Sequence, residues 1–183
     1  YGGGKVFKED PNNESSLNHY AESKLLFDNY YRDHVAKIKS QVSGLRYFNV
    51  YGPRESHKEG MFSVVYSFFC QLEKSSQIKL FKGSHGYDDG EQRRDFIHVK
   101  DVVRANIAAA KYTPKLNGEC YNVGSGKNYS VNEIAGMFGG DKVYNEGVIE
   151  PKETLACTAK IDLDLDFRPN NELKDWIHKW ITT

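Results

Sequence analysis

Residues 19–24 read HYAESK and residues 46–58 read RYFNVYGPRESHK, and the rest of the chain is organised around these two stretches. Tyr20 and Lys24 are four residues apart, so on a helix they share one face. A lysine ammonium beside a phenol stabilises the phenolate, which makes Tyr20 a candidate proton acceptor near neutral pH. Lys58 adds a second candidate base in a loop that follows a strand. Two bases that reach one carbon from opposite sides are what inversion of a stereocentre needs.

A tyrosine and a lysine four residues apart are not a specific signal alone, because such pairs also occur on solvated helix faces. The motifs that follow the pair along the chain make the signal specific. Four motifs follow one another along the chain, namely Tyr20 with Lys24, a strand at residues 45–51 that holds Asn49, a loop at residues 52–60, and Arg-Asp-Phe at residues 94–96. In this order they resemble the extended short-chain dehydrogenase/reductase family of nucleotide-sugar epimerases and dehydratases. Within that family, the segment from Arg46 to Lys58 resembles the heptose 6-epimerase branch most.

The resemblance implies a role for each matching residue. Tyr20 would be the acid/base tyrosine, and Lys58 the second acid/base on the opposite side of the sugar. Lys24, Val50 and Lys58 would contact the cofactor, which is expected to be NADP, with NAD as the alternative. Substrate contacts are expected at Asn49, Gly60, Ser67, Phe81, Lys82, Gly83, Ser84 and Arg94. Hydride would pass from the sugar to the bound nicotinamide cofactor and return to the other face.

Simpler structural roles compete with these assignments. Asn49 could cap the turn that follows its strand, and Lys58 could be a solvated loop lysine. Arg94 could form a structural pair with Asp95, although a guanidinium suits bidentate binding of a diphosphate. Thr154 stands near a position where the epimerases often have an aromatic residue, so the sugar and the nucleotide stay open.

Composition excludes several other classes of protein. The chain has 183 residues, enough for a sizeable core, and 25 acidic residues balance 25 basic ones. Zero net charge argues against a general nucleic-acid or membrane-surface binder, and no apolar run is long enough to span a membrane. The three cysteines are widely spaced and odd in number, so they are expected to be reduced thiols in a cytoplasmic protein. The six histidines are scattered, so no metal site is predicted.

Strands and helices alternate along the chain, which indicates an α/β fold. The resemblance implies the C-terminal part of a Rossmann-type NAD(P)-binding fold plus a smaller α/β substrate-binding domain. Residues 1–55 would be the remnant of the Rossmann domain. Residues 56–183 would form mainly the substrate domain, with some segments returning to the Rossmann sheet.

No glycine-rich phosphate loop follows a strand in this sequence. The glycines at residues 2–4 are a weak substitute, because they lack the preceding strand and the following helix. The sequence is therefore expected to be the C-terminal half, or slightly more, of a longer enzyme that forms a homo-oligomer. Such a piece would expose an open sheet edge and an apolar face.

Periodicity predicts the local structure in enough detail to be checked. A helix is expected over residues 17–39, capped by Ser15, Ser16 or Asn18 and with Phe27, Tyr31, Val35 and Ile38 facing the core. A second is expected over residues 61–72, with Phe62, Val65, Phe69 and Leu72 inward. Ser130 and Glu133 have the spacing of a capping box. Residues 158–161 are expected to be extended.

Three functions remain open at this point. The first is a nucleotide-diphospho-sugar epimerase of the heptose 6-epimerase type. The second is a UDP-hexose 4-epimerase or a nucleotide-sugar 4,6-dehydratase, in which one tyrosine suffices and Lys58 is incidental. The third is a non-catalytic sugar-nucleotide-binding fragment, for which these 183 residues alone would bind neither NADP nor NAD.

Overall fold

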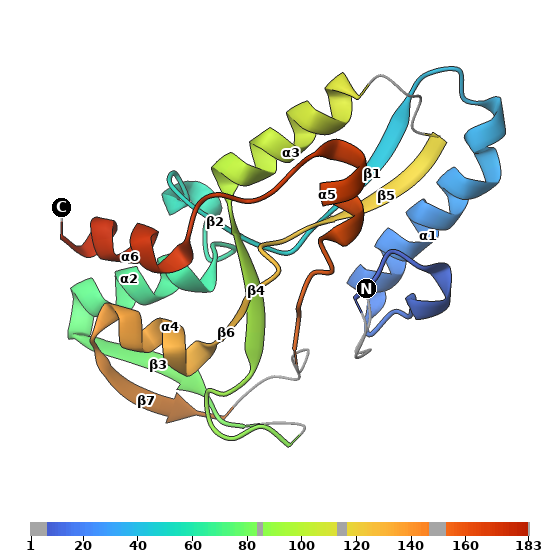
Figure 1. The fold of residues 1–183 in the computed structure, drawn as a ribbon. Coiled ribbons are helices and arrows are strands. Elements are labelled where there is room, and N and C mark those ends of the chain that lie inside the picture. The colour runs from blue at the N-terminus through green and yellow to red at the C-terminus, as the bar shows by residue number, and fades with distance from the viewer. Residues whose placement is uncertain (1–6, 84–85, 113–116, 147–152, 183) are drawn as a thin grey trace.

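The computed structural model describes residues 7–83, 86–112, 117–146 and 153–182, and Figure 1 shows their arrangement. The helices are α1 His19–His34, α2 Val64–Ser75, α3 Val99–Lys111, α4 Val131–Phe138, α5 Ala159–Leu165 and α6 Leu173–Ile181. The strands are β1 Val42–Tyr47, β2 Asn49–Tyr51, β3 Gln77–Phe81, β4 Arg93–His98, β5 Asn117–Val123, β6 Asn128–Ser130 and β7 Asp141–Asn145. Short 3₁₀ helices lie at Pro11–Asn13, Val35–Lys37 and Ser56–Lys58. None of the helices in these ranges is long and apolar enough to cross a membrane.

The strands pair mainly in parallel. β1 pairs with β5, β2 pairs with β4, and β3 pairs with β7, all in parallel, while β6 runs antiparallel to β4. Parallel pairing requires crossover connections, and α2 lies in the one that leads from β2 to its partner β4. The α/β class predicted from the sequence is therefore confirmed.

The core consists of two clusters that meet at β4. Successive side chains of a strand point to opposite faces, so Phe96 joins one cluster and Ile97 the other. The first cluster packs α2, α4 and α6 against β3 and includes Phe68, Ile78, Ile134 and Ile177. The second packs α3 and α5 against β5 and includes Val102, Ala105, Tyr121 and Ile161. Figure 1 shows β4 passing between these two groups of elements.

Side-chain caps fix where three of the helices begin. Asn18 Oδ1 accepts from the amide of Ala21 at the start of α1, as one of the three predicted caps. Ser63 Oγ accepts from the amide of Tyr66 and begins α2 later than expected. The capping box predicted for Ser130 and Glu133 is present at the start of α4.

The first predicted helix needs two corrections. α1 ends at His34, and Val35–Lys37 continues as a 3₁₀ helix in place of the expected α-helix to residue 39. Phe27 does not face the core, because its side chain is 69% exposed. Tyr20, Leu26 and Tyr30 are exposed on the same helix, so α1 buries little apolar surface among the described residues.

Two further predictions need comment. In α2 the most buried residues are Val65, as predicted, and Phe68, which was not predicted, while Phe69 is half-buried, packs against the first cluster and stacks on Trp180. Residues 158–161 are not extended, since α5 begins at Ala159. Ile161 and Leu165, four residues apart, are both buried in the second cluster, so packing of this helical face decides the structure there.

His98 should make stability depend on pH. It is buried against Tyr51 and Trp176, and its Nδ1 caps α3 by accepting from the amide of Lys100. Burial lowers the pKa of His98, although Asp101 opposes this. A histidine with a lowered folded pKa binds more protons when unfolded, so stability falls as pH drops below about 6.5.

We therefore expect the free energy of unfolding to fall from about pH 7.5 to about pH 5.5, and to fall less in His98→Asn. Asparagine keeps a capping oxygen and does not titrate. Urea unfolding of both proteins at the two pH values measures the difference. An equal fall in both proteins would show that other groups carry the pH dependence.

Candidate active site

The larger of two neighbouring cavities, about 860 Å³, is lined by α1, by β1 and by residues that precede α1. Tyr20 and Lys24 both line it, as their shared helix face predicts. The Lys24 ammonium lies 5.2 Å from the centre of the Tyr20 ring, so the pair forms a cation–π contact. The Tyr20 side chain is 73% exposed, which leaves its hydroxyl accessible from the cavity.

Paired charges build one wall of this cavity. Glu14 accepts from Arg32 at 2.6 Å and from Arg46 at 2.5 Å, and Arg46 also donates to Asp28 at 2.7 Å. Burial alone would raise the pKa of Glu14, but the hydrogen bonds from the two arginines hold the pKa below its usual value. The network ties the segment before α1 to α1 and β1, and so fixes the position of the tyrosine–lysine helix.

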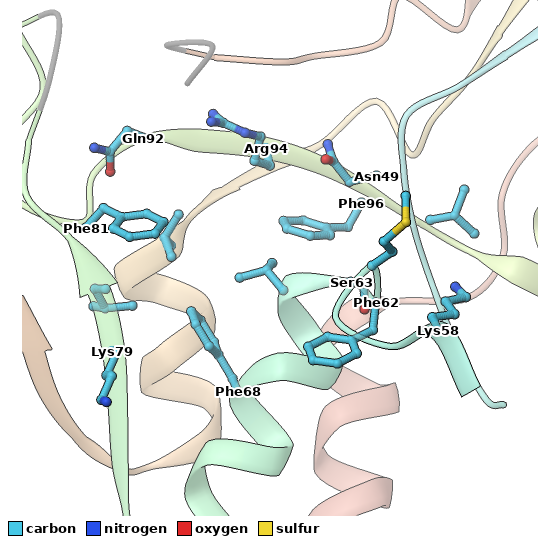
Figure 2. A pocket seen from close by; sticks show the side chains of 15 residues that line it. Asn49, Lys58, Phe62, Ser63, Phe68, Lys79, Phe81, Gln92, Arg94 and Phe96 are labelled. Atoms are coloured by element: carbon cyan, nitrogen blue, oxygen red, sulfur yellow. The ribbon is translucent and has the colours of Figure 1, made fainter. Parts of the chain in front are cut away.

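The smaller cavity, about 350 Å³, contains five of the residues predicted from the sequence. Asn49, Val50, Lys58, Phe81 and Arg94 all line it. Figure 2 shows Lys58 at one end and Phe81 at the other. Between them the cavity is lined by aromatic rings, namely Phe62, Phe68 and Phe96. Such a mixture of apolar walls and a few polar groups is typical of small-molecule sites.

Lys58 is held by a carboxylate that the sequence analysis did not single out. Glu55 is 3% exposed and accepts from the Lys58 ammonium at 3.2 Å. It also accepts from the amide of Gly52 and from both the amide and the hydroxyl of Ser63. Glu55 therefore fixes the whole loop from β2 to α2.

Arg94 and Asp95 do not form the structural pair considered as the alternative. Arg94 is buried, and its Nη1 donates to the carbonyl of Arg93. Asp95 points elsewhere, towards the loop after β5, and accepts from the amides of Ser125, Gly126 and Ala156. Burial raises the pKa of Asp95, and these hydrogen bonds oppose that rise. Asp95 is thus a structural residue behind the cavity wall.

Asn49 joins the two cavities, because it lines both. Tyr20 lines only the larger cavity and Lys58 only the smaller one. The structure therefore does not bring the two predicted bases into one cavity. Their joint action on one sugar atom stays a prediction, and it requires a substrate that reaches past Asn49 into both spaces.

Four predicted substrate contacts lie outside both cavities, namely Gly60, Ser67, Lys82 and Gly83. The Ser67 hydroxyl accepts from Gln71, and Lys82 pairs with Glu146, a hydrogen bond that raises the pKa of Lys82. A Cβ on Gly83 would lie 2.1 Å from the carbonyl oxygen of Tyr87, so this glycine allows its own loop to pack closely. Ser84 lies outside the described residues.

Sequence reasoning missed the part played by Thr154. Its hydroxyl lies within 3.3 Å of the Asn49 amide nitrogen and 3.1 Å of the backbone nitrogen of Asp95. No local pattern connects residues 49 and 154, which are 105 positions apart in the chain. The three cysteines carry free thiols, as predicted. Within the described ranges, no group of three or more potential ligands is placed to hold a metal ion.

Comparison with known proteins finds a family model and curated relatives that match this chain. The sequence model of the NAD dependent epimerase/dehydratase family matches residues 1–124. The chain is 52% identical over 135 residues to an ADP-L-glycero-D-manno-heptose-6-epimerase of Alkalilimnicola ehrlichii, a match that covers 74% of this chain. It spans only 42% of the length of that curated relative.

Solved structures extend the likeness to the whole chain. The crystal structure of the Helicobacter pylori ADP-L-glycero-D-manno-heptose-6-epimerase superposes with a TM-score of 0.84 at 34% identity, over 100% of this chain and 56% of that one. UDP-glucuronic acid 4-epimerase from Bacillus cereus, in complex with UDP-glucuronic acid and NAD, superposes with a TM-score of 0.76 at 26% identity. That match covers 90% of this chain and 51% of the other.

Proposed function

Because the chain belongs to the NAD dependent epimerase/dehydratase family, we propose that it carries part of the active site of a nucleotide-diphospho-sugar epimerase. The proposed substrate is an ADP-glycero-manno-heptose, as the names of its relatives suggest. The observation that carries this proposal is the position of Asn49 between the cavity of Tyr20 and Lys24 and the cavity of Lys58. A substrate held at Asn49 has access to both sides.

Each residue then has a specific task. Asn49 holds the sugar, and the buried guanidinium of Arg94 attracts the diphosphate, since planar guanidinium groups bind phosphate oxygens well. The Tyr20 phenol, with Lys24 beside it, handles the proton on one side of the reacting carbon. Lys58, held by Glu55, handles the proton on the other side. The aromatic walls of the smaller cavity exclude water from this region.

The larger cavity fits one end of a nicotinamide cofactor. Lys24 would hold the nicotinamide ribose from the larger cavity, while Val50 and Lys58 would lie near the nicotinamide from the side of the smaller cavity. When bound, the cofactor supplies the acceptance and return of hydride. We infer NADP, with NAD as the alternative.

The proposed division of the chain follows the two clusters. Residues 1–55, with the segments that pack around β5, would belong to the Rossmann domain. Most of residues 56–183 would form the substrate domain around the first cluster. The exposed apolar side chains of α1 are consistent with burial against further protein, either in the same chain or in a homo-oligomer.

A second candidate is a 4-epimerase or a 4,6-dehydratase, which needs only the tyrosine. The placement of Tyr20 and Lys58 in different cavities favours it. In such an enzyme Lys58 would only brace the loop through its ion pair with Glu55.

Lys58→Met separates the two candidates. We expect inversion of ADP-glycero-manno-heptose, measured by NMR of the recovered sugar in the presence of NADP, to slow by about 10²-fold, because one general acid/base is lost. Lys79→Met is the matched control, since Lys79 lines the same cavity but Figure 2 shows its ammonium directed away. An unchanged rate in Lys58→Met would reject two-base inversion and support the single-tyrosine reaction.

A further inference from the structure

The orientation of the Asn49 amide is fixed by its neighbours. Its nitrogen lies 2.8 Å from the carbonyl oxygen of Asp95. A backbone carbonyl can only accept a hydrogen bond, so the atom that faces it must be the nitrogen. The second amide hydrogen points to the Thr154 hydroxyl oxygen, 3.3 Å away. Both donors of Asn49 are therefore used within the protein.

Thr154 is itself held in place. Its amide donates to the carbonyl of Arg93 at 3.1 Å, and its hydroxyl oxygen accepts from the amide of Asp95 at 3.1 Å. With the bond from Asn49, both lone pairs of that oxygen are occupied. Glu153 forms a parallel bridge with Arg93, the first residue of β4. This pairing with the strand fixes the position of the adjacent Thr154.

Within the part of the chain that the structure describes, the side-chain atom of Asn49 left without a hydrogen-bond partner is Oδ1, which can only accept. Figure 2 shows this oxygen on the side of the amide that is nearer the Phe96 ring, and Phe96 lines the smaller cavity together with Asn49. A phosphate oxygen cannot donate to it at neutral pH, whereas a sugar hydroxyl can. The chemistry of the exposed atom therefore selects a sugar hydroxyl as its partner.

We propose that Thr154 is a positioning residue that turns the Asn49 amide so that Oδ1 accepts a hydrogen bond from a hydroxyl group of the substrate sugar. The part of this inference that concerns the substrate sugar rests on the proposed function. A site built to pair with a hydroxyl discriminates strongly, because an unpaired buried acceptor is costly. Thr154 would thus contribute to the choice of sugar without contacting the reacting carbon.

The first arm of the test needs no ligand. Hydrogen exchange of the Asn49 side-chain amide, followed by NMR, should be about fivefold faster in Thr154→Val, which keeps the shape but removes the hydroxyl. Thr154→Ser keeps the hydroxyl and should exchange at the wild-type rate. Equal exchange rates in Thr154→Val and the wild type would overturn the positioning role.

The second arm measures affinity by calorimetry with two probes, ADP-glycero-manno-heptose and ADP. Thr154→Val should bind the nucleotide sugar about tenfold more weakly and ADP unchanged, since ADP lacks the heptose and its hydroxyls, while Thr154→Ser should match the wild type. An equal loss for both probes, or an equal loss in both variants, would overturn the proposal. Absence of binding by the wild type would overturn the proposed function, while the exchange rates would still decide the positioning role.

Discussion

Asp95→Ala should lower the free energy of unfolding by about 3–5 kcal/mol, the largest loss expected from any single polar substitution here. The carboxylate is fully buried and accepts from the amides of Ser125, Gly126 and Ala156 and from the Ser125 hydroxyl. Alanine would leave three backbone donors without their acceptor, and one of them, the amide of Ala156, is buried. The variant would also loosen the contact between the loop after β5 and the segment that follows Thr154.

Asp95→Asn tests the reason for this effect. An amide has the same shape, but its nitrogen would face backbone donors on one side, so we expect it to recover only part of the loss. Asp33→Ala is the matched control, because Asp33 is exposed on α1, and we expect a change within about 0.5 kcal/mol. Urea unfolding measures all three. If Asp95→Ala proved no less stable than Asp33→Ala, the hydrogen bonds to Asp95 would not be what holds this loop.

Much of the fold could be predicted because local signals and packing agree. The capping box at Ser130 and Glu133 begins α4 as the spacing indicates. Disagreement arises where the outcome depends on distant partners. Phe27 has the helical spacing of a core residue, yet no described element covers that face of α1. Residues 158–161 look extended in isolation, and only the surface offered by β5 makes the Ile161 face of a helix favourable.

The candidate site, too, could be predicted from the sequence only in part. Motif order placed Asn49, Lys58, Phe81 and Arg94 around one cavity, because each lies at a strand end or in the loop that follows. Glu55, which holds Lys58, lies three residues before it in the sequence. In a loop, however, the spacing of two charged residues does not determine whether their side chains meet. The sequence also could not show that Tyr20 and Lys58 would line different cavities, since that depends on the packing of α1 against β1.

Phe68→Ala should lower the free energy of unfolding by about 3–5 kcal/mol, the usual range when a buried phenylalanine is truncated. Phe68 is 2% exposed and packs edge-to-face on Phe138, with ring centres 6.3 Å apart. The same side chain forms part of the wall of the smaller cavity. Its loss would therefore both weaken the first cluster and enlarge the space where the sugar is proposed to bind.

Phe69→Ala is the comparison that ranks a half-buried phenylalanine against the fully buried Phe68. Sequence periodicity predicts that Phe69 faces the core, and the structure places it half-buried against the first cluster, stacked on Trp180 with ring centres 4.2 Å apart. We expect Phe69→Ala to cost only about 1–2 kcal/mol, which covers the lost stacking and partial burial. Urea unfolding of the two variants ranks them directly. A larger loss in Phe69→Ala than in Phe68→Ala would mean that α2 is rotated relative to the arrangement described above, and that the cavity wall is formed by a different helix face.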